Sequence, residues 1–260
     1  MNLILFCLTT MSKKYQYRVE NIVPEKDQQD PKKDQIARMF DSISGQYDFL
    51  NHLLSFGIDY YWRFVVVSIL KKYGAKRVLD VATGTGDLAL AAHEQGGAEE
   101  VIGIDIARKM LSVGHQKIAD KGLDPAVRLE YGDAENLQFP DNNFDAVTVA
   151  FGVRNFGDLE KGLQEMARVL KPGGLALILE FSQPQATPMK QLYRFYSYQI
   201  LPSVGKIFSK SASAYQYLPE SVSAFPYGKA FTHIMQKSGF RQTKVQPLTF
   251  GVSSIYLGKK

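Results

Sequence analysis

Residues 77–87 read Arg-Val-Leu-Asp-Val-Ala-Thr-Gly-Thr-Gly-Asp, an apolar run that leads into a glycine-rich turn. The pattern predicts a strand over 77–82, a tight turn, and a helix over 87–95. Gly84 and Gly86 allow the turn and bring the backbone close to a ligand where any Cβ would collide. A second apolar strand, expected over 101–105, ends at Asp105, whose carboxylate suits ribose hydroxyls. Together these features predict a nucleotide-cofactor site.

The turn differs from a dinucleotide-binding fingerprint in two ways. The third glycine is missing, and Asp87 stands where a pyrophosphate would meet the helix N-terminus, so an anion is disfavoured there. A cofactor with a ribose, no phosphates and a positive charge fits better, because Asp80 and Asp87 place carboxylates at the mouth. S-adenosylmethionine has those properties. An NAD-dependent dehydrogenase, a non-catalytic cofactor-binding module and a strand–turn–helix with incidental glycines are the alternatives.

Strand and helix patterns alternate along most of the chain, with short connections. Such alternation predicts an α/β fold, a Rossmann-like and mostly parallel seven-stranded sheet with helices on both faces. The last two strands, over 242–248 and 251–258, should form an antiparallel hairpin that extends one edge. The remaining predicted elements are helices over 107–121 and 158–170 and strands over 127–131, 144–151 and 175–181.

The chain divides by composition into a lead-in and one domain. Residues 1–35 are expected to be a disordered or exposed lead-in, since most of them are polar and Pro24 and Pro31 break any helix. The domain, 36–260, should carry a helical cap over 36–73, interrupted near Gly45, and an aromatic-rich insertion over 184–231.

The N-terminal ten residues are apolar but much shorter than the ~20 residues of a membrane-spanning helix. They lack the basic start and the small-residue cleavage site of a signal peptide, and a start of translation at Met11 instead of Met1 would explain them.

Composition limits the classes of function. The chain has 260 residues, 45% hydrophobic content and a net charge of +5, which suits weak attraction to an anionic membrane surface. No cluster of basic residues is as dense as a nucleic-acid arm, so no nucleic-acid partner is expected. The single cysteine, Cys7, excludes an internal disulfide and is compatible with the cytoplasm.

Three further motifs extend the prediction beyond the cofactor loop. Residues 47–57 read Tyr-Asp-Phe-Leu-Asn-His-Leu-Leu-Ser-Phe-Gly, residues 151–155 read Phe-Gly-Val-Arg-Asn, and residues 168–174 read Arg-Val-Leu-Lys-Pro-Gly-Gly. With Trp62 and the Glu-Phe-Ser of 180–182, they resemble the S-adenosylmethionine-dependent methyltransferases of ubiquinone and menaquinone biosynthesis. The resemblance covers about 36–259. The sequence departs from the family's pattern at one position. The family usually has a histidine three residues after the glycine that corresponds to Gly57, and this chain has Asp59 or Tyr60 there.

The resemblance implies a set of cofactor contacts and no metal. It places Thr85 and the backbone of Gly84 and Gly86 at the methionine part, and Asp105 at the ribose. Asp133 and Ala134 would flank the adenine, although Asp133 could instead satisfy its own turn. The neighbouring residues expected to complete the cofactor site are Asp80, Ile106 and Ala150.

The resemblance also implies the acceptor, the ring carbon of demethylmenaquinol, or alternatively of 2-methoxy-6-polyprenyl-1,4-benzoquinol. Arg154 and Asn155 should stand past a strand's carboxyl end, where Arg154 could stabilise a phenolate, bind the cofactor carboxylate or tie down a loop. Tyr47 could assist proton removal or pack over the cofactor, and His52 and His233 are the candidate bases.

The aromatic insertion has two interpretations, plain core or a wall for the isoprenoid tail. A cytoplasmic enzyme, either free or peripheral at the inner face of the membrane, follows from a membrane-dissolved polyprenyl quinol substrate. A homo-oligomer stays an open prediction.

Overall fold

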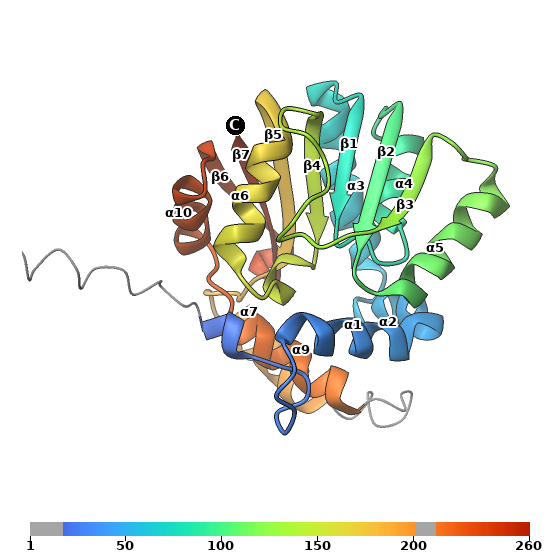
Figure 1. Ribbon diagram of the computed structural model, residues 1–260. Coiled ribbons are helices and arrows are strands. Elements are labelled where there is room, and N and C mark those ends of the chain that lie inside the picture. The colour runs from blue at the N-terminus through green and yellow to red at the C-terminus, as the bar shows by residue number, and fades with distance from the viewer. Residues whose placement is uncertain (1–17, 201–211) are drawn as a thin grey trace, which may run out of the picture.

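The computed structural model describes residues 18–200 and 212–260, and its centre is a seven-stranded sheet (Figure 1). The strand order is β3-β2-β1-β4-β5-β7-β6, with the first five strands parallel and β7 antiparallel to both β5 and β6. The predicted fold class is confirmed. The bounds are β1 Arg77–Val81, β2 Glu100–Asp105, β3 Val127–Tyr131, β4 Phe144–Ala150, β5 Leu170–Phe181, β6 Arg241–Leu248 and β7 Ser253–Lys259.

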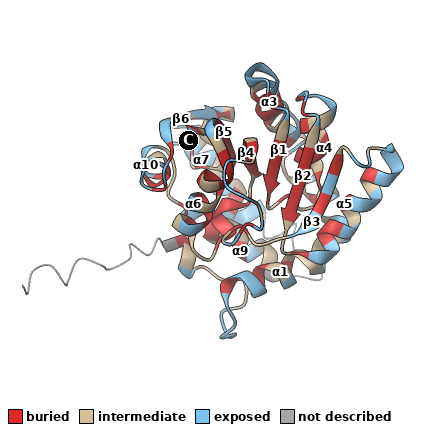
Figure 2. Cartoon of the chain, turned by 45° about the horizontal axis from the view of Figure 1, so that its top comes forward, coloured by how far each residue is buried: buried red, intermediate tan, exposed pale blue. Residues whose placement is uncertain are grey.

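Two hydrophobic clusters cover the two faces of the sheet, as the alternation along the strands requires. Helices α3 (Ile58–Tyr73), α4 (Asp87–Glu94) and α5 (Arg108–Lys121) cover one face. Helices α6 (Leu159–Val169) and α10 (Lys229–Lys237) cover the other. Buried residues concentrate on the central strands (Figure 2). The sheet is therefore buried on both faces, as is typical of parallel sheets.

A group of helices lies beyond the carboxyl ends of the parallel strands (Figure 1). The predicted interruption near Gly45 is confirmed, since the 3₁₀ turn η2 (Ser44–Gln46) separates the first two helices of this cap. The cap consists of α1 (Lys32–Ile43), η2, α2 (Tyr47–Leu54), α7 (Met189–Phe195), the π-helical turn η4 (Tyr196–Ile200) and α9 (Ala212–Ala224). The cap therefore faces the edge of the sheet where ligands bind in such folds.

Residues 26–31 of the expected lead-in are exposed, but the described part of it also has ordered elements and buried residues at its two ends. A 3₁₀ turn, η1 (Arg18–Asn21), buries Val19, and α1 begins at Lys32, directly after Pro31. The buried Lys32 Nζ donates hydrogen bonds to the carbonyls of Val19 (2.7 Å) and Arg154 (3.0 Å). One apolar side chain and one lysine thus fix a segment whose composition reads as exposed. Residues 1–17, with Cys7 and both candidate start methionines, lie outside the described residues.

Two further boundaries differ from the predictions. Strand β5 begins at Leu170 instead of 175, because Leu170 pairs with Phe144 before a shift of register brings Leu175 opposite Ala146. The described parts of the 184–231 insertion are largely helical, although their mixed aromatic spacing showed no clear period. Residues 201–211 of the insertion lie outside the described part of the chain.

Among the described residues, no single helix is long and apolar enough to cross a membrane. The stretches Lys32–Leu54 and Ile58–Tyr73 reach that length and composition only as a pair, and they meet at a 95° bend.

Candidate active site

A small pocket of about 70 Å³ opens at the carboxyl ends of β1, β2 and β4. At its centre the Asp105 carboxylate accepts hydrogen bonds from the backbone N–H groups of Gly84 and Ala107, both at 2.8 Å. Burial raises the pKa of Asp105, and these amides oppose the rise. The predicted cofactor residues that line this pocket are Gly84, Asp105, Ile106, Asp133, Ala134 and Ala150.

The residue types at the pocket are those that would hold the adenosine part of S-adenosylmethionine. Gly84 and Gly86 adopt φ of +58° and +80°, and a Cβ on Gly86 would come within 3.2 Å of the Leu129 side chain. Such a turn leaves backbone instead of side chains against the ligand. The Asp105 carboxylate still has acceptor capacity for ribose hydroxyls. The residues present therefore fit the cofactor.

Asp133 makes the turn interaction that the sequence left open, and it also lines the small pocket, where its contact with adenine stays a prediction. Its Oδ1 accepts the N–H of Glu135 at 2.9 Å, a turn interaction, while its Oδ2 lies 2.9 Å from Nζ of Lys33. Lys33 comes from α1 and lines the same pocket. The cap thus closes the adenine end with a lysine that the sequence did not indicate.

Asp80 is buried at the carboxyl end of β1 and accepts hydrogen bonds from the hydroxyls of Thr83 and Thr148, each at 2.6 Å. Burial raises its pKa to about 6, although both threonine bonds favour the charged form. Asp87, in contrast, already has cationic partners: Nζ of Lys117 lies 2.6 Å from its carboxylate and the Arg63 guanidinium 3.7 Å from it. Asp80 is therefore the acid whose charge can respond to a cationic ligand.

Binding of S-adenosylmethionine should strengthen as pH rises from 5 to 7. The cofactor's positive charge favours ionised Asp80, whereas a pKa of about 6 leaves that group mostly protonated at the lower pH. One pH unit below the pKa, only about a tenth of the Asp80 carboxyl groups are ionised, so the affinity is about tenfold lower. Titration calorimetry in the two buffers measures the change, and Asp80→Asn should flatten it. A pH-independent affinity in the unaltered protein would remove Asp80 from this role.

Asp105→Ala should weaken S-adenosylmethionine binding by about 1.5–3 kcal/mol, the range for hydrogen bonds to a charged group. The substitution removes the acceptor for ribose and also releases the N–H of Gly84. Calorimetry on protein with an unchanged circular dichroism spectrum is the measurement. Asp120→Ala, which alters an exposed carboxylate on α5, is the control. Unchanged affinity in Asp105→Ala would exclude Asp105 from the cofactor site.

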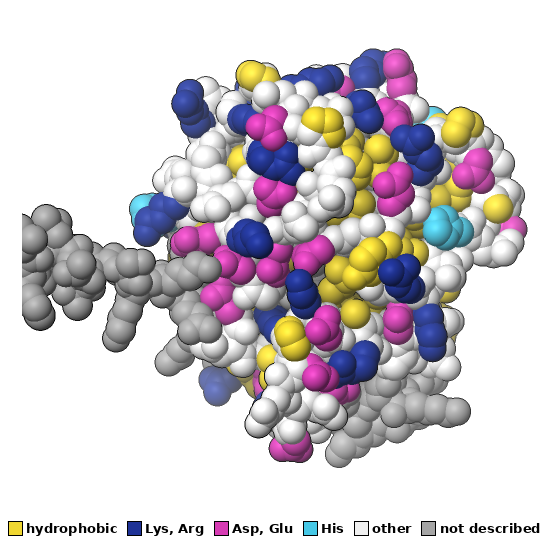
Figure 3. Space-filling model, in the orientation of Figure 1, with side chains coloured by type: hydrophobic (Ala, Val, Ile, Leu, Met, Phe, Trp, Pro, Cys, Tyr) yellow, Lys and Arg dark blue, Asp and Glu magenta, His cyan; other side chains and the backbone are white. Residues whose placement is uncertain are grey.

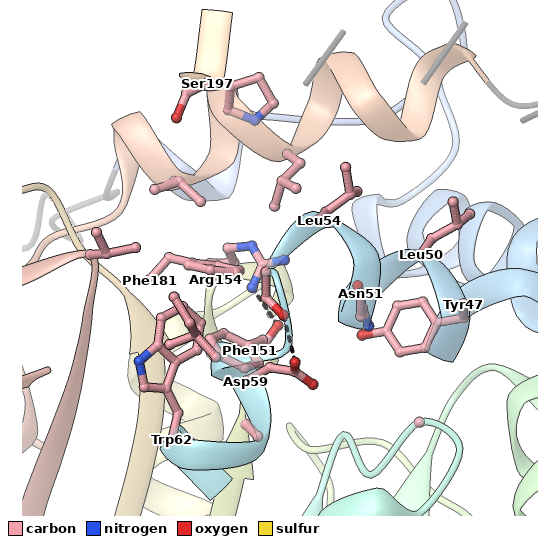
Figure 4. Close-up of a pocket in the computed structure, with 18 of the residues that line it drawn as sticks. Tyr47, Leu50, Asn51, Leu54, Asp59, Trp62, Phe151, Arg154, Phe181 and Ser197 are labelled. Carbon is pink, nitrogen blue, oxygen red and sulfur yellow. Dashed lines mark hydrogen bonds between the residues drawn. The ribbon is translucent and has the colours of Figure 1, made fainter. Parts of the chain in front are cut away.

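A second and larger cavity, of about 570 Å³, lies between the sheet edge and the cap. Its wall is predominantly apolar and comes from α1, α2, α3, α7, η4 and α9 together with the strand ends. In Figure 4, Leu50 and Leu54 of α2 face Phe151, Phe181 and Trp62 across the space. The two cavities share the wall residues Phe40, Tyr47, Ala82, Gly84, Ala150 and Phe151. A ligand in the larger space would therefore meet the cofactor at this shared wall.

The only charged pair among the described residues that is almost fully buried is Arg154 with Glu180. The Arg154 Nη1 lies 2.8 Å from Glu180 Oε1, and the guanidinium stands over the Phe181 ring at 5.5 Å. Burial raises the pKa of Glu180, which Arg154 counteracts. The Nε of Arg154 has no hydrogen-bond partner among the described residues. Arg154 lines the cavity, but this Nε is itself buried, so what Arg154 brings to the cavity wall is its positive charge.

Asn155 and Tyr47 both line the small pocket. Asn155 lines the small pocket, and its Oδ1 accepts the Tyr217 hydroxyl at 2.9 Å. Tyr47 is part of the wall shared by both cavities, and burial raises its pKa, so its hydroxyl is neutral. A neutral phenol with a raised pKa orients a ligand better than it removes a proton. In Figure 4 its ring lies beside Asn51.

Thr85 joins the glycine loop to the cap. Its hydroxyl donates to Asp48 Oδ1 at 2.6 Å, and Lys117 bridges the other Asp48 oxygen and Asp87 at 2.6 Å each. The role that resemblance gave Thr85, contact with the methionine part, remains compatible with its place in the cavity wall.

Of the two candidate bases, only His52 is near the cavity. His52 Nδ1 lies 2.7 Å from Oδ2 of the buried Asp59, whose other oxygen accepts the Ser55 hydroxyl. Asp59 and Ser55 line the cavity, whereas His52 stands behind them and is partly exposed. His233 is exposed on α10 and lines neither cavity, so its prediction as a base is wrong. Its place in the sequence, close to the insertion, had suggested proximity.

The aromatic insertion contributes side chains both to the core and to the wall of the large cavity. Phe225 and Phe231 are buried and pack in the main core, with Phe231 against Tyr256 at 4.7 Å. Tyr193, Phe195 and Tyr196 line the large cavity. Phe208 and the side chain of Tyr215 lie outside the described part of the chain.

The sequence missed several residues of the site. Lys33, Asp59 and Tyr217 carried no recognised signal, and Glu180 entered only as part of a resembling motif. An acid at the end of an otherwise apolar strand, as at Glu180, is the one pattern that could have indicated a buried partner.

The fold and the paired cavities define a Rossmann-like methyltransferase that uses S-adenosylmethionine. Solved structures share this fold, among them a methyltransferase from Thermotoga maritima described as a possible histamine N-methyltransferase (TM-score 0.56, 19% identity, 86% of this chain and 99% of that one). A further one, from Methanococcus maripaludis, is described as a putative S-adenosyl-L-methionine-dependent methyltransferase (TM-score 0.57, 17% identity, 91% and 96%). The chain belongs to the ubiE/COQ5 methyltransferase family, whose model matches residues 26–260.

Two relatives illustrate the similarity. Demethylmenaquinone methyltransferase of Bacteroides fragilis is 45% identical over 229 residues, which cover 88% of this chain and 94% of that protein. Ubiquinone/menaquinone biosynthesis C-methyltransferase UbiE of Geobacter sulfurreducens is 45% identical over 230 residues, 88% and 90% of the two chains.

Proposed function

We propose that this enzyme transfers a methyl group from S-adenosylmethionine to a ring carbon of demethylmenaquinol and so produces menaquinol. The observation that carries the proposal is the large apolar cavity that shares a wall with the cofactor pocket. An aromatic ring with an apolar tail suits such a space. Relatives named demethylmenaquinone methyltransferase, which match most of this chain, support the choice of acceptor.

The second candidate acceptor is 2-methoxy-6-polyprenyl-1,4-benzoquinol. Relatives named ubiquinone/menaquinone biosynthesis C-methyltransferase favour it, and they are as similar as the first group. Both acceptors are quinols with a polyprenyl tail, so the apolar wall suits either of them.

The reaction needs an electron-rich ring carbon and a dry, well-aligned approach. The cofactor supplies an electrophilic methyl group on a sulfonium. The ring carbon forms the new C–C bond, the S–CH₃ bond breaks with its electron pair going to sulfur, and one proton leaves the acceptor. The residues of the chain therefore have to orient a ring oxygen, exclude water and accept a proton.

Arg154 is placed to stabilise the ring oxygen as it becomes phenolate-like. Glu180 holds the guanidinium through Nη1, and the positive charge of Arg154 at the cavity wall would favour a phenolate-like oxygen. Tyr47 would orient a ligand at the shared wall, and Asn155 would orient the cofactor in the small pocket. Tyr217 fixes the amide of Asn155 from α9.

Asp59 and His52 form a route for the proton that leaves the acceptor. Asp59 faces the cavity, while His52, with 25% of its side chain exposed, connects that carboxylate to solvent. Burial would raise the pKa of Asp59, but hydrogen bonds from Ser55 and His52 and the charge of Arg63 lower it. The carboxylate therefore stays ionised, so that it can accept the proton from the acceptor and pass it to the neutral imidazole, whose Nδ1 lies 2.7 Å from Oδ2.

The enzyme acts, we propose, from the cytoplasm at the inner face of the membrane, since a polyprenyl quinol is dissolved in lipid. Nucleic acid is not a proposed partner. On the face shown in Figure 3, basic and acidic side chains alternate and form no single basic field. A homo-oligomer remains a prediction from the sequence.

Assay of methyl transfer to a panel of reduced quinols tests the proposed acceptor. With labelled S-adenosylmethionine, demethylmenaquinol should become labelled. Turnover of the methoxy-benzoquinol alone would replace the first acceptor by the second. Transfer to neither quinol, while calorimetry shows bound cofactor, would contradict both.

A further inference from the structure

Exposed large apolar side chains of the described residues gather around the mouth of the large cavity. All except Tyr131 lie on α2, α3, α7, η4 and η5 (Thr249–Gly251) or in the turn between α2 and α3, and Tyr73 is the last residue of α3. We name the exposed residues that also line the cavity the rim: Phe56, Ile58, Leu192, Phe195 and Ile200. An exposed apolar patch that surrounds a cavity mouth marks an interaction site.

The rim joins elements that are far apart in the sequence. The Phe56 ring, 79% exposed, lies 6.2 Å from the Tyr196 ring, and the Tyr196 hydroxyl donates to the carbonyl of Leu54. The turn between α2 and α3 is thus fastened to η4. Phe250, 80% exposed in η5, follows the cavity-lining Thr249, whose hydroxyl accepts the indole N–H of Trp62 on α3. The turn between α2 and α3, the π-helical turn η4 and the 3₁₀ turn η5 therefore each carry an exposed apolar side chain near the cavity mouth.

The exposed charges on the segments that carry the rim residues are basic, while the nearby acids Asp48 and Asp87 are both paired with Lys117. Helix α7 carries exposed Lys190 and Arg194, and Met189–Ile200 contains no acid. In residues 49–64 the only acid is Asp59, which is buried. Aromatic and aliphatic tips beside cations are the pattern of a surface that enters the headgroup region of an anionic bilayer.

We infer that the rim, together with Phe250 and Tyr198, is a membrane-docking surface that places the cavity mouth on an anionic lipid bilayer. The inference rests on the proposed function in one respect, because a polyprenyl acceptor would then enter from lipid with its ring first. A cavity of about 570 Å³ is of the size that holds a drug-like ligand. A long tail would therefore remain in the bilayer during the reaction.

Sedimentation with vesicles tests the docking surface. The unaltered protein should bind phosphatidylcholine–phosphatidylglycerol vesicles, and a part of that binding should survive in high salt because apolar insertion is not screened. The double variant Phe250→Asp/Tyr198→Asp should bind about tenfold or more weakly, since burial of one phenylalanine is worth at least that factor. Neither residue lines the cavity, and Phe250 has φ of +56°, which aspartate tolerates.

Two controls separate docking from folding and charge. Tyr73→Asp makes the same change on an exposed tyrosine at the other end of α3 and should leave vesicle binding unchanged. Lys190→Gln/Arg194→Gln should remove the preference for anionic over neutral vesicles while some binding to both remains.

Three results would overturn the inference. The first is equal vesicle binding by the Phe250→Asp/Tyr198→Asp variant and the unaltered protein. The second is loss of all vesicle binding by the unaltered protein at high salt. The third is a change of oligomeric state in the variant without any vesicle binding by either protein, which would make the surface a protein interface. Methylation of a tail-less quinol in solution should be the same in this variant and the unaltered protein. If neither methylates it, the proposed function fails while the vesicle result still decides the docking surface.

Discussion

Methyl transfer should occur only when the acceptor is reduced to its quinol. An oxidised quinone ring is electron-poor and cannot donate electrons to a sulfonium methyl group, whereas the quinol can, and more so once its hydroxyl proton leaves. We expect no measurable turnover of the quinone and full turnover after chemical reduction. The measurement is transfer of labelled methyl with and without a reductant, and equal rates on both forms would refute this mechanism.

The rate with quinol should also rise with pH and then level off, because the group that accepts the hydroxyl proton must itself be unprotonated. His52→Gln should remove or displace this rising limb, whereas His233→Gln, on the exposed face of α10, should leave it unchanged. An unaltered pH profile in His52→Gln would exclude the Asp59–His52 route while leaving the need for a quinol in place.

Glu180→Ala should lower the free energy of unfolding by about 3–5 kcal/mol, the usual result of removing one partner from a buried ion pair. Glu180 is fully buried, and its loss leaves the Arg154 guanidinium without a counter-charge. Urea denaturation at pH 7 measures the change. Glu180→Gln, which keeps a hydrogen-bond acceptor, should lose less.

The matched control for Glu180 is Glu94→Ala. Glu94 pairs with Lys121 at 2.7 Å, but both side chains are largely solvated, so the expected loss is about 0.2–1 kcal/mol. If Glu180→Ala costs no more than Glu94→Ala, Arg154 does not depend on Glu180 for its place in the site.

The cofactor loop shows how far sequence reasoning reaches. The strand, the glycine turn and the helix at 77–95 form from neighbouring residues, so their period and glycines suffice to predict them. The position of Asp105 beside the glycine turn was also predictable, because the carboxyl ends of adjacent parallel strands meet at one edge of the sheet.

The partners of the residues on the acceptor side could not be predicted from the sequence. Arg154 was predicted at the site, but its partner Glu180 is 26 residues away on the next strand. Asn155 is fixed by Tyr217, 62 residues away, and Lys33 reaches Asp133 across 100 residues. No periodicity in the chain relates such residues. The prediction of His233 as a base was wrong for a related reason, since closeness in sequence to the insertion does not imply closeness in space to the cavity.

The sequence by itself determined the α/β class, the order of elements and the cofactor loop, because each depends on local spacing of apolar residues and glycines. Only the tertiary structure decided which polar groups are paired and which cap residues form the acceptor cavity. It also placed β7 between β5 and β6, so that β6 forms the edge. These features depend on distant segments that meet only after the sheet has assembled, and burial then determines the charge and partners of each side chain.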